Sequence, residues 1–215
     1  MRWGMVINLT KCVGCYACAI SCKQEYFLPP GMMWSRLLIS EIGQYPRVAR
    51  QTYPVLCNHC KEPLCTKVCP TGASQRREDG IISVNADKCV GCRYCLIVCP
   101  YQARSYFQKR KEYFPGQGLT EFEKVGEKLY PLQHGVVYKC DFCSKRIDDG
   151  IKKGMKPGID REATPVCVLS CPTKARGFGD LDDPNSEVAI LRGSRKAIQL
   201  RPEYCTDPSV YYILG

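Results

Sequence analysis

Histidine and long apolar runs are both scarce in this sequence of 215 residues. It has only two histidines, and no apolar stretch approaches the roughly 18 residues that a membrane-spanning helix requires. Nothing in it resembles a hydrolytic triad, a glycine-rich phosphate loop, or a metal-bound water flanked by general bases. The short apolar start carries one charge, Arg2, and runs directly into Cys12, so we expect no secretory signal peptide. These absences argue against a membrane-spanning protein, a secreted protein or a hydrolase.

Cysteine, by contrast, is abundant: the chain has 17, far above ordinary usage. Sixteen of them fall into four groups, and three of these groups are followed directly by proline. Groups one and three are spaced C-x2-C-x2-C-x3-C, group two is C-x2-C-x4-C-x3-C, and group four is split into two pairs. In chain order the groups are Cys12, Cys15, Cys18 and Cys22; Cys57, Cys60, Cys65 and Cys69; Cys89, Cys92, Cys95 and Cys99; and Cys140, Cys143, Cys167 and Cys171. Only Cys205 lies outside them, and we expect it to be a free thiol.

Such cysteine groups can form disulfides, bind zinc or hold iron–sulfur clusters. Disulfides suit small secreted chains, and structural zinc sites close with two C-x2-C pairs. Here every group ends in x3-C, which is the ligand pattern of bacterial ferredoxins. In that pattern three cysteines bind one iron–sulfur cube, and the fourth, one helical turn further on, binds the neighbouring cube. We therefore expect four 4Fe-4S clusters, with zinc and disulfides as the alternatives.

The formal net charge of +10 would by itself suggest a nucleic-acid partner. Sixteen thiolates and four oxidised cubes would bring the loaded protein to about +2. Lysines also stand beside the cysteine groups, at Lys11, Lys23, Lys88 and Lys139. The basic excess is therefore interpreted as a balance for anionic clusters, and no nucleic-acid partner is expected.

An internal repeat supports this interpretation. The segment Asn8–Cys15 recurs as Asn85–Cys92, with an offset of 77 residues, and Cys-Pro-x-x-Ala occurs three times. Each copy of the longer repeat follows a short apolar segment, residues 5–7 and 81–84, that suits a strand. We expect an α+β fold of ferredoxin-like units, with short strands, short helices and little regular secondary structure.

The reciprocal fourth ligand allows two ways of pairing the groups. Groups two and three are adjacent and would form one two-cluster unit, residues 53–103, inserted into a second unit formed by residues 1–28 and 138–180. Pairing group one with two, and three with four, follows the order of the chain and stays open. The interleaved pairing gives four ligand sets, which we name sites. Site I is Cys12, Cys15, Cys18 and Cys171; site II is Cys22, Cys140, Cys143 and Cys167; site III is Cys57, Cys60, Cys65 and Cys99; site IV is Cys69, Cys89, Cys92 and Cys95.

The chain resembles the four-cluster electron-transfer subunits of molybdopterin oxidoreductases of the dimethyl sulfoxide reductase type. The resemblance rests on the order of the four groups, with an opening and an ending most like the arsenate, polysulfide and thiosulfate reductase branches. It also rests on four segments, Leu56–Cys60, Cys69–Ala73, Lys139–Cys143 and Phe178–Pro184. The resemblance implies the interleaved pairing, a linear relay of clusters, and a four-iron cluster at Cys92, where some relatives have tryptophan. It also implies a large molybdenum or tungsten pterin subunit as the catalytic partner, and an integral-membrane quinol-oxidising subunit as a further candidate partner.

The resemblance orients the relay, with site I nearest the catalytic subunit, and we expect site III at the opposite end. Charges close in sequence to the ligands should tune the clusters: Lys11 and Arg176 should raise the potential of site I, and Glu62 should lower that of site III. Between its two ligand neighbours, His59 is expected to be a structural hydrogen-bonding residue, with tuning of a cluster as the alternative. His134 is expected at the surface.

Three segments contain no ligand. Residues 29–52 and 104–137 are rich in aromatics and too long for plain connectors, so we expect them either to dock a catalytic subunit or to cover the clusters. The tail, residues 181–215, should begin with a helix capped by Ser186 and should wrap either a partner or the second unit.

The sequence thus predicts a non-catalytic electron-transfer subunit of an anaerobic respiratory reductase. The alternatives are a ferredoxin-like subunit of a hydrogenase or carbon monoxide dehydrogenase, and a free polyferredoxin. We expect the chain on the periplasmic face of the bacterial cytoplasmic membrane, exported together with its partner, with the cytoplasm as the alternative.

Overall fold

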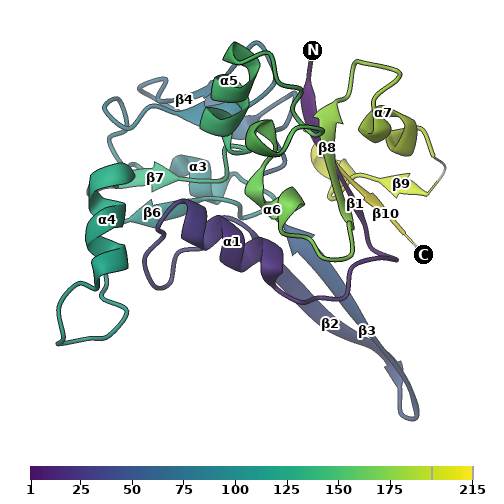
Figure 1. Cartoon of the computed structure of the whole chain (residues 1–215), viewed down its shortest axis with the longest axis horizontal. Helices are drawn as coiled ribbons and strands as arrows, with labels where there is room; N and C mark the ends of the chain where they lie inside the picture. The colour runs from purple at the N-terminus through teal and green to yellow at the C-terminus, as the bar shows by residue number, and fades with distance from the viewer. Residues whose placement is uncertain (195, 215) are drawn as a thin grey trace.

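The computed structural model describes residues 1–194 and 196–214, and shows an α+β protein built from short elements (Figure 1). Over those residues, no helix combines the length and the apolar character needed to cross a membrane. The helices are α1 (Ala17–Glu25), α2 (Leu64–Lys67), α3 (Tyr94–Ile97), α4 (Glu121–Leu129), α5 (Ser144–Lys152), α6 (Val166–Leu169) and α7 (Glu187–Arg192), with 3-10 turns at Arg161–Ala163 and Pro202–Tyr204. The strands are β1 (Trp3–Asn8), β2 (Arg36–Gln44), β3 (Arg47–Val55), β4 (Ser74–Arg76), β5 (Ile82–Val84), β6 (Ser105–Phe107), β7 (Val136–Tyr138), β8 (Arg176–Asp180), β9 (Ala197–Ile198) and β10 (Val210–Ile213).

The largest sheet joins the two ends of the chain. Its strand order is β8-β1-β10-β9, with β1 antiparallel to β8 and parallel to β10. Met5 pairs with Phe178 on one side and with Val210 on the other. Because strand β1 is covered on both faces, its residues form an almost continuous apolar run rather than an alternating one.

Three two-stranded sheets complete the fold. Strands β4 and β5 join through the turn at Arg77–Gly80, and β6 pairs with β7. Strands β2 and β3 form a hairpin of nine paired positions that projects from the body of the molecule (Figure 1). Several large apolar side chains of this hairpin are exposed: Leu38, Ile39, Ile42, Tyr45 and Val48. The hairpin therefore presents an apolar surface with no partner in this chain.

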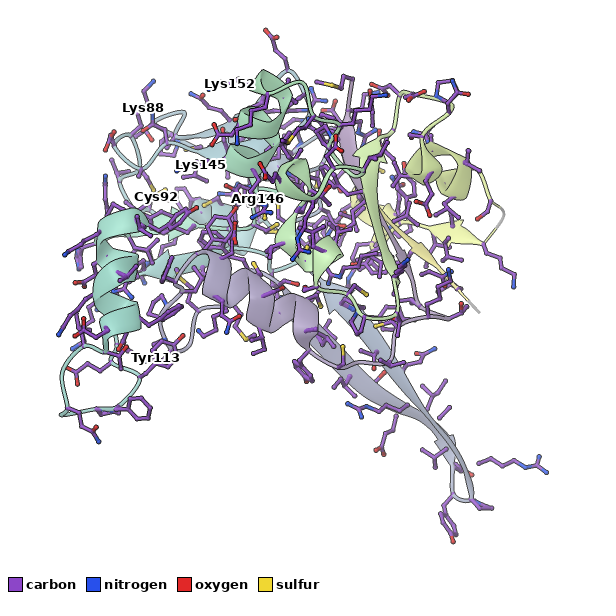
Figure 2. All side chains as sticks on the ribbon, viewed as in Figure 1. Lys88, Cys92, Tyr113, Lys145, Arg146 and Lys152 are labelled. Carbon is purple, nitrogen blue, oxygen red and sulfur yellow. The ribbon has the colours of Figure 1, made fainter. Side chains whose placement is uncertain are left out.

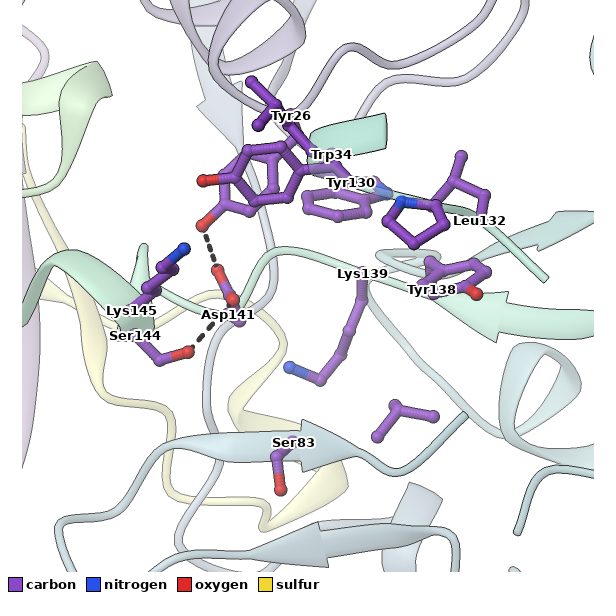
Figure 3. Close-up of a pocket in the computed structure, with 13 residues that line it drawn as sticks. Tyr26, Trp34, Ser83, Tyr130, Leu132, Tyr138, Lys139, Asp141, Ser144 and Lys145 are labelled. Carbon is purple, nitrogen blue, oxygen red and sulfur yellow. Dashed lines mark hydrogen bonds between the residues drawn. The ribbon is translucent and has the colours of Figure 1, made fainter. Parts of the chain in front are cut away.

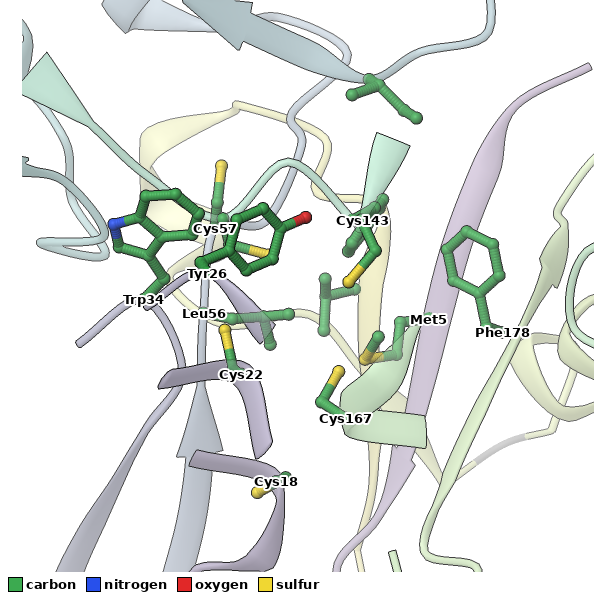
Figure 4. Packing of buried hydrophobic residues seen from close by; sticks show 14 of the residues in the cluster. Met5, Cys18, Cys22, Tyr26, Trp34, Leu56, Cys57, Cys143, Cys167 and Phe178 are labelled. Carbon is green, nitrogen blue, oxygen red and sulfur yellow. The ribbon is translucent and has the colours of Figure 1, made fainter. Parts of the chain in front are cut away.

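The core mixes cysteine with aromatic and aliphatic side chains (Figure 4). Trp3 stacks on Phe178, and Phe178 meets Phe142 edge-on at a centroid distance of 5.3 Å. Cys18, Cys22 and Cys167 are buried in the same cluster. The apolar side chains alone make a small core for a chain of 215 residues, so bound groups held by the buried cysteine sulfurs would add to it.

Residues of segment 104–137 pack against the turn that follows helix α1. Helix α4 begins with a capping box in which Thr120 and Glu123 exchange hydrogen bonds. Phe122 packs on Phe27, and the Tyr113 hydroxyl donates to the carbonyl of Leu28. This segment therefore covers the body of the protein, whereas the hairpin of residues 36–55 extends away from it.

The tail, residues 181–215, contacts residues of the segment 53–103, which is one of the two placements expected for it. Ser186 accepts a hydrogen bond from the Ala189 amide at 3.1 Å and caps α7, which confirms the predicted cap. Further on, the Ser209 hydroxyl donates to the His59 carbonyl, and Thr206 lies 2.6 Å from the Tyr101 hydroxyl. Strand β10 then enters the largest sheet.

Candidate metal centres

Two of the four predicted ligand sets line well-defined cavities. The cysteines of site I surround one cavity, together with Gly14, Leu37 and Arg176. The cysteines of site IV surround a second cavity, with Gly91, Val137 and Arg104 in the corresponding places. Each cavity thus takes three cysteines from one group and a fourth from a group elsewhere in the chain.

The cysteines of site II form a buried set. All four are buried, and Figure 4 shows Cys22, Cys143 and Cys167 near one another although they come from α1, the start of α5 and α6. Burial raises the pKa of the Cys22 thiol, and the nearby Cys167 and Cys143 sulfurs raise it further. Burial likewise raises the pKa of Cys140, with Cys22 and Cys167 as the nearest charges.

Site III is brought together in the same way. Burial raises the pKa of the Cys60 thiol to about 12, and the neighbouring Cys57, Cys65 and Cys99 sulfurs act in the same direction. The Thr206 hydroxyl of the tail opposes this shift by hydrogen bonding. The cysteines expected at site III thus affect the pKa of one another, as those expected at site II do, and Cys205 is exposed and free.

The sites follow one another in the order I, II, III, IV. The Cys18 sulfur of site I affects the pKa of Cys167 in site II, and Cys57 of site III affects that of Cys140 in site II. Cys65 of site III in turn affects Cys95 of site IV. Cys15 and Cys92, in the first and last sites, are exposed. The expectation that site III lies at an end was wrong, because site III lies between sites II and IV.

Short helices explain how one cysteine group serves two sites. In group one the third and fourth cysteines both lie on α1. In the other groups the third lies on α2, α3 or α6, and the fourth comes two residues after that helix ends. Residues four apart on a helix are neighbours along one face, separated by about 6 Å of axial rise. Pro63 and Pro165 precede α2 and α6, where their missing amide hydrogen costs nothing.

The loops between the first two ligands turn tightly. Gly14 and Gly91 occupy the same position of the repeat and have φ angles of 67° and 68°. Glycine adopts such left-handed conformations without the steric cost that other residues pay. A Cβ atom at Gly91 would lie 2.2 Å from the Gly135 carbonyl oxygen, and one at Gly14 would lie 3.0 Å from the Thr52 hydroxyl. Both positions therefore favour glycine for its conformation, and at Gly91 the lack of space requires it as well.

The fourth ligands of the two end sites accept backbone hydrogen bonds. The Ala175 amide donates to the Cys171 sulfur at 3.2 Å, and the Ser74 amide donates to the Cys69 sulfur at 3.4 Å. Hydrogen bonds of this kind stabilise thiolates and tune cluster potentials. For Cys69 they outweigh the opposing effect of burial, so its pKa is lowered.

His59 is more specifically placed than the sequence indicates. It is fully buried, stacks on Phe142 at 3.7 Å, and accepts the Ile82 amide at Nδ1. Burial lowers the pKa of His59 well below its usual value, and Lys139 and Arg104 act in the same direction. Its Nε2 is buried and has no hydrogen-bond partner in the part of the chain that the structure describes. The expected structural hydrogen bond is thus present. The one sequence signal for the stack is that His59 in Cys-Asn-His-Cys and Phe142 in Cys-Asp-Phe-Cys occupy the same position of two similar motifs.

Buried donors without partners fit a set of cluster sites. The His59 Nε2 and the Arg104 Nη1 are both buried, and neither has an acceptor among residues 1–194 and 196–214. Cluster sulfurs would supply acceptors for such groups. Among residues 1–194 and 196–214, no three Cys, His, Asp or Glu side chains lie close enough to hold one metal ion. A tetrahedral zinc ion would need sulfurs about 3.8 Å apart, whereas the ligands of a cube stand further apart around a larger body.

A separate cavity of about 450 Å³ lies beside these sites (Figure 3). Its walls include Tyr26, Trp34, Tyr138 and Lys145. The polar group at its centre, Asp141, accepts hydrogen bonds from the Tyr26 hydroxyl, the Ser144 hydroxyl and the Cys143 amide. These contacts tie Asp141 to the loop that carries Cys143, so it supports the site II ligands.

The surface charges are spread over several elements. Figure 2 shows Lys88, Lys145, Arg146 and Lys152 on one face, with Cys92 toward the same edge as Lys88. Arg146 pairs with Glu25 at 3.0 Å, which ties α5 to α1. His134 is exposed, as expected.

Comparison with known proteins agrees with this geometry. Residues 48–128 match the family described as "4Fe-4S dicluster domain". The chain is 40% identical over 227 aligned residues to the iron–sulfur subunit assigned to a dimethyl sulfoxide reductase in Halobacterium salinarum, with 100% of this chain and 79% of the relative covered. It is 37% identical over 237 residues to the arsenate respiratory reductase iron–sulfur subunit of Shewanella sp. ANA-3, covering 99% and 96%. It is 36% identical over 222 residues to a subunit of the selenate reductase of Mesobacillus selenatarsenatis, covering 99% and 72%.

These matches extend over nearly the whole chain and agree with cysteine groups suited to 4Fe-4S clusters. They confirm the resemblance drawn from the sequence, and they give no support to a hydrogenase or carbon monoxide dehydrogenase subunit. The chain belongs to the family of iron–sulfur electron-transfer subunits of dimethyl sulfoxide reductase-type oxidoreductases.

Proposed function

We propose that the protein holds four 4Fe-4S clusters at sites I to IV and passes single electrons along them in that order. The observation that carries this proposal is that two separate cavities each gather the four cysteines expected at sites I and IV, with the exposed Cys15 in one and the exposed Cys92 in the other. The cysteines hold the cubes, and the clusters supply the redox chemistry. The rate of electron tunnelling falls steeply with distance. Clusters at consecutive sites would therefore divide a long transfer into short, fast steps.

The interleaved pairing and its two ferredoxin-like units are part of this proposal. One unit comprises residues 1–28 and 138–180, and the other comprises residues 53–103. Cys171 in the site I cavity and Cys69 in the site IV cavity support it, because each serves the group that this pairing assigns to it. The pairing of group one with two would instead require Cys69 beside site I.

Both ends of the series carry matching apolar rims. Val13 and Ile20 flank site I, and Val90 and Ile97 occupy the positions 77 residues further on, beside site IV. All four are exposed, Ile97 by 78% and Val90 by 67%. Apolar rims around an exposed ligand suit partner docking, because contact both excludes water and shortens the tunnelling distance. The partners proposed are a molybdenum or tungsten pterin catalytic subunit at site I and a quinol-oxidising membrane subunit at site IV.

The hairpin of β2 and β3 extends the rim of site I. Leu37 and Pro54 at its base line the site I cavity, and Tyr45 near its tip is 92% exposed. We assign the hairpin, which overlaps the proposed docking segment 29–52, to docking of the catalytic subunit, and residues 104–137 to covering. The proposed location is the periplasmic face of the cytoplasmic membrane, reached by export with the catalytic subunit.

The experiment is to purify the chain with its co-purifying large subunit under anaerobic conditions and to measure iron, acid-labile sulfide, molybdenum and tungsten. We expect about 16 irons with matching sulfide per chain, as four cubes require, and one pterin metal in the large subunit. About eight irons, or stoichiometric zinc, would contradict the four-cluster relay. A loaded monomer that captures no large subunit would favour a free polyferredoxin.

A further inference from the structure

Two buried arginines occupy equivalent places in the chain. Arg104 and Arg176 each follow Cys-Pro-x-x-Ala directly, at the end of groups three and four. They are only 8% and 4% exposed. Arg176 lines the site I cavity, and Arg104 lines the site IV cavity.

Neither guanidinium has a carboxylate partner. Among the ion pairs formed by residues 1–194 and 196–214, none includes Arg104 or Arg176. The Arg176 contacts are neutral: Nη2 donates to the Ser35 hydroxyl at 3.3 Å, and Nη1 lies 3.8 Å from the Met5 sulfur. Arg104 donates to the Ser74 hydroxyl at 2.6 Å. A buried arginine stays charged, and an unpaired buried charge is costly, so each requires a negative group nearby.

Cysteine sulfurs are the negative groups within reach. Burial lowers the pKa of Arg176, but the Cys167 and Cys18 sulfurs more than offset this, so its pKa is raised. Cys18 belongs to site I and Cys167 to site II. Arg176 therefore lies against both sites of one pair.

Arg104 shows the same arrangement in the other pair. Burial lowers its pKa, and the sulfurs of Cys65, Cys95 and Cys57 more than offset this. Cys57 and Cys65 belong to site III, and Cys95 belongs to site IV. Its Nη1 is buried and has no hydrogen-bond partner among the described residues, so it can donate to a cluster sulfur.

We propose that Arg176 and Arg104 are redox-tuning residues, each placed so that one buried positive charge is shared by two adjacent clusters. This inference rests on the proposed four-cluster relay. Each one-electron reduction adds a negative charge to a cluster, and a cation a few ångströms away in a low-dielectric interior stabilises that charge. Arg176 thereby raises the potentials of sites I and II, and Arg104 raises those of sites III and IV. The electron enters one end and leaves at the other, and neither arginine changes its protonation.

Exposed charges close to the ligands provide matched controls. Lys11 precedes Cys12 directly but is exposed, and Glu62 lies within group two but is 56% exposed and paired with Lys67 at 2.9 Å. Water and salt screen such charges strongly. The sequence assigned tuning to Lys11, Arg176 and Glu62 alike. The structure separates the buried arginine from the two solvated residues and adds Arg104.

The test is a redox titration followed by electron paramagnetic resonance, on the purified complex, of Arg176→Gln, Arg104→Gln, Lys11→Gln and Glu62→Gln. Iron and sulfide are counted in each sample first. We expect Arg176→Gln to lower the midpoint potentials of two clusters and Arg104→Gln to lower those of the other two. The two control variants should match the wild type. Fully loaded arginine variants with unchanged potentials, or controls that shift as much, would overturn the proposal.

The lysine variants keep the test decisive if a glutamine variant loses its clusters. Arg176→Lys and Arg104→Lys keep the charge but lose the planar fork. Full iron content with near-native potentials in these variants would support a role for the charge. Cluster loss in the lysine variants as well would show that the guanidinium is needed for structure, and would overturn the tuning role. A wild-type iron count below about 16 would instead refute the four-cluster relay itself.

Discussion

Alanine substitutions at Gly14 and Gly91 should have unequal effects, although the two glycines occupy the same position of the repeat. Both have left-handed φ angles, so alanine should cost about 1–2 kcal/mol at either position, a factor of roughly 5–30 in the local equilibrium. At Gly14 the new Cβ meets only the Thr52 side chain, at 3.0 Å, and Thr52 can rotate away. At Gly91 it meets the Gly135 carbonyl at 2.2 Å, and backbone must move, which adds about 1–3 kcal/mol.

The measurement is iron content together with the temperature at which the cluster absorbance is lost. Gly91→Ala should lose about a quarter of the iron, the share of one cube in four, while Gly14→Ala should keep nearly all of it. Gly72→Ala is the control for strain alone, because its φ is also left-handed at 64° and its Cβ would meet nothing within 4 Å. Equal iron loss at Gly14 and Gly91, or a loss at Gly72 as large as at Gly91, would refute this reasoning.

Three further predictions follow from the same structure. Cys22→Ser should remove the signal of site II and leave that of site I largely intact, and magnetic resonance showing the reverse would refute the reciprocal ligand assignment. Tyr45→Asp, at the exposed tip of the hairpin, should reduce co-purification with the catalytic subunit without changing iron content, and undiminished recovery of the complex would remove the hairpin from the interface. Burial opposes the ionisation of Asp207, but hydrogen bonds from Arg2 and Gln199 hold its pKa below the usual value. This contact should therefore stabilise the tail at pH values above roughly 4, and the stabilisation should be lost as the pH falls through the lower pKa of the folded state. Protection of the β10 amides from hydrogen exchange should fall on acidification in the wild type, but this loss should be absent in Asp207→Asn.

Local sequence signals were sufficient for much of the site. The spacing of the cysteines predicted four groups whose fourth cysteine serves a neighbouring site, and the resemblance to a known family selected the interleaved pairing. The Ser186 cap and the apolar segment that became β1 were predicted because a few neighbouring residues determine both.

What could not be predicted depended on contacts between distant segments. Spacing alone cannot say whether site III or site IV, both within residues 53–103, faces the unit formed by residues 1–28 and 138–180. Site III was therefore placed at an end, although Cys57 influences the pKa of Cys140. Arg104 was missed although it follows Cys-Pro-x-x-Ala just as Arg176 does, because its burial against the ligands could not be read from the sequence. The hairpin of β2 and β3 was not foreseen as an extended arm, since its apolar residues resemble those of a buried strand.

The pairing of β1 with β10 has a consequence for the order of synthesis. Residues 53–103 contain every ligand of sites III and IV, so these sites can close once about half of the chain has left the ribosome. Sites I and II must wait for Cys167 and Cys171, and β1 finds its parallel neighbour only when Val210–Ile213 has emerged. At roughly 5–20 residues per second, this leaves the first four cysteines of the nascent chain without their partners for several seconds. The thiols made first would therefore be the last to be protected, and they are the ones that most require a chaperone or an anaerobic cell during translation.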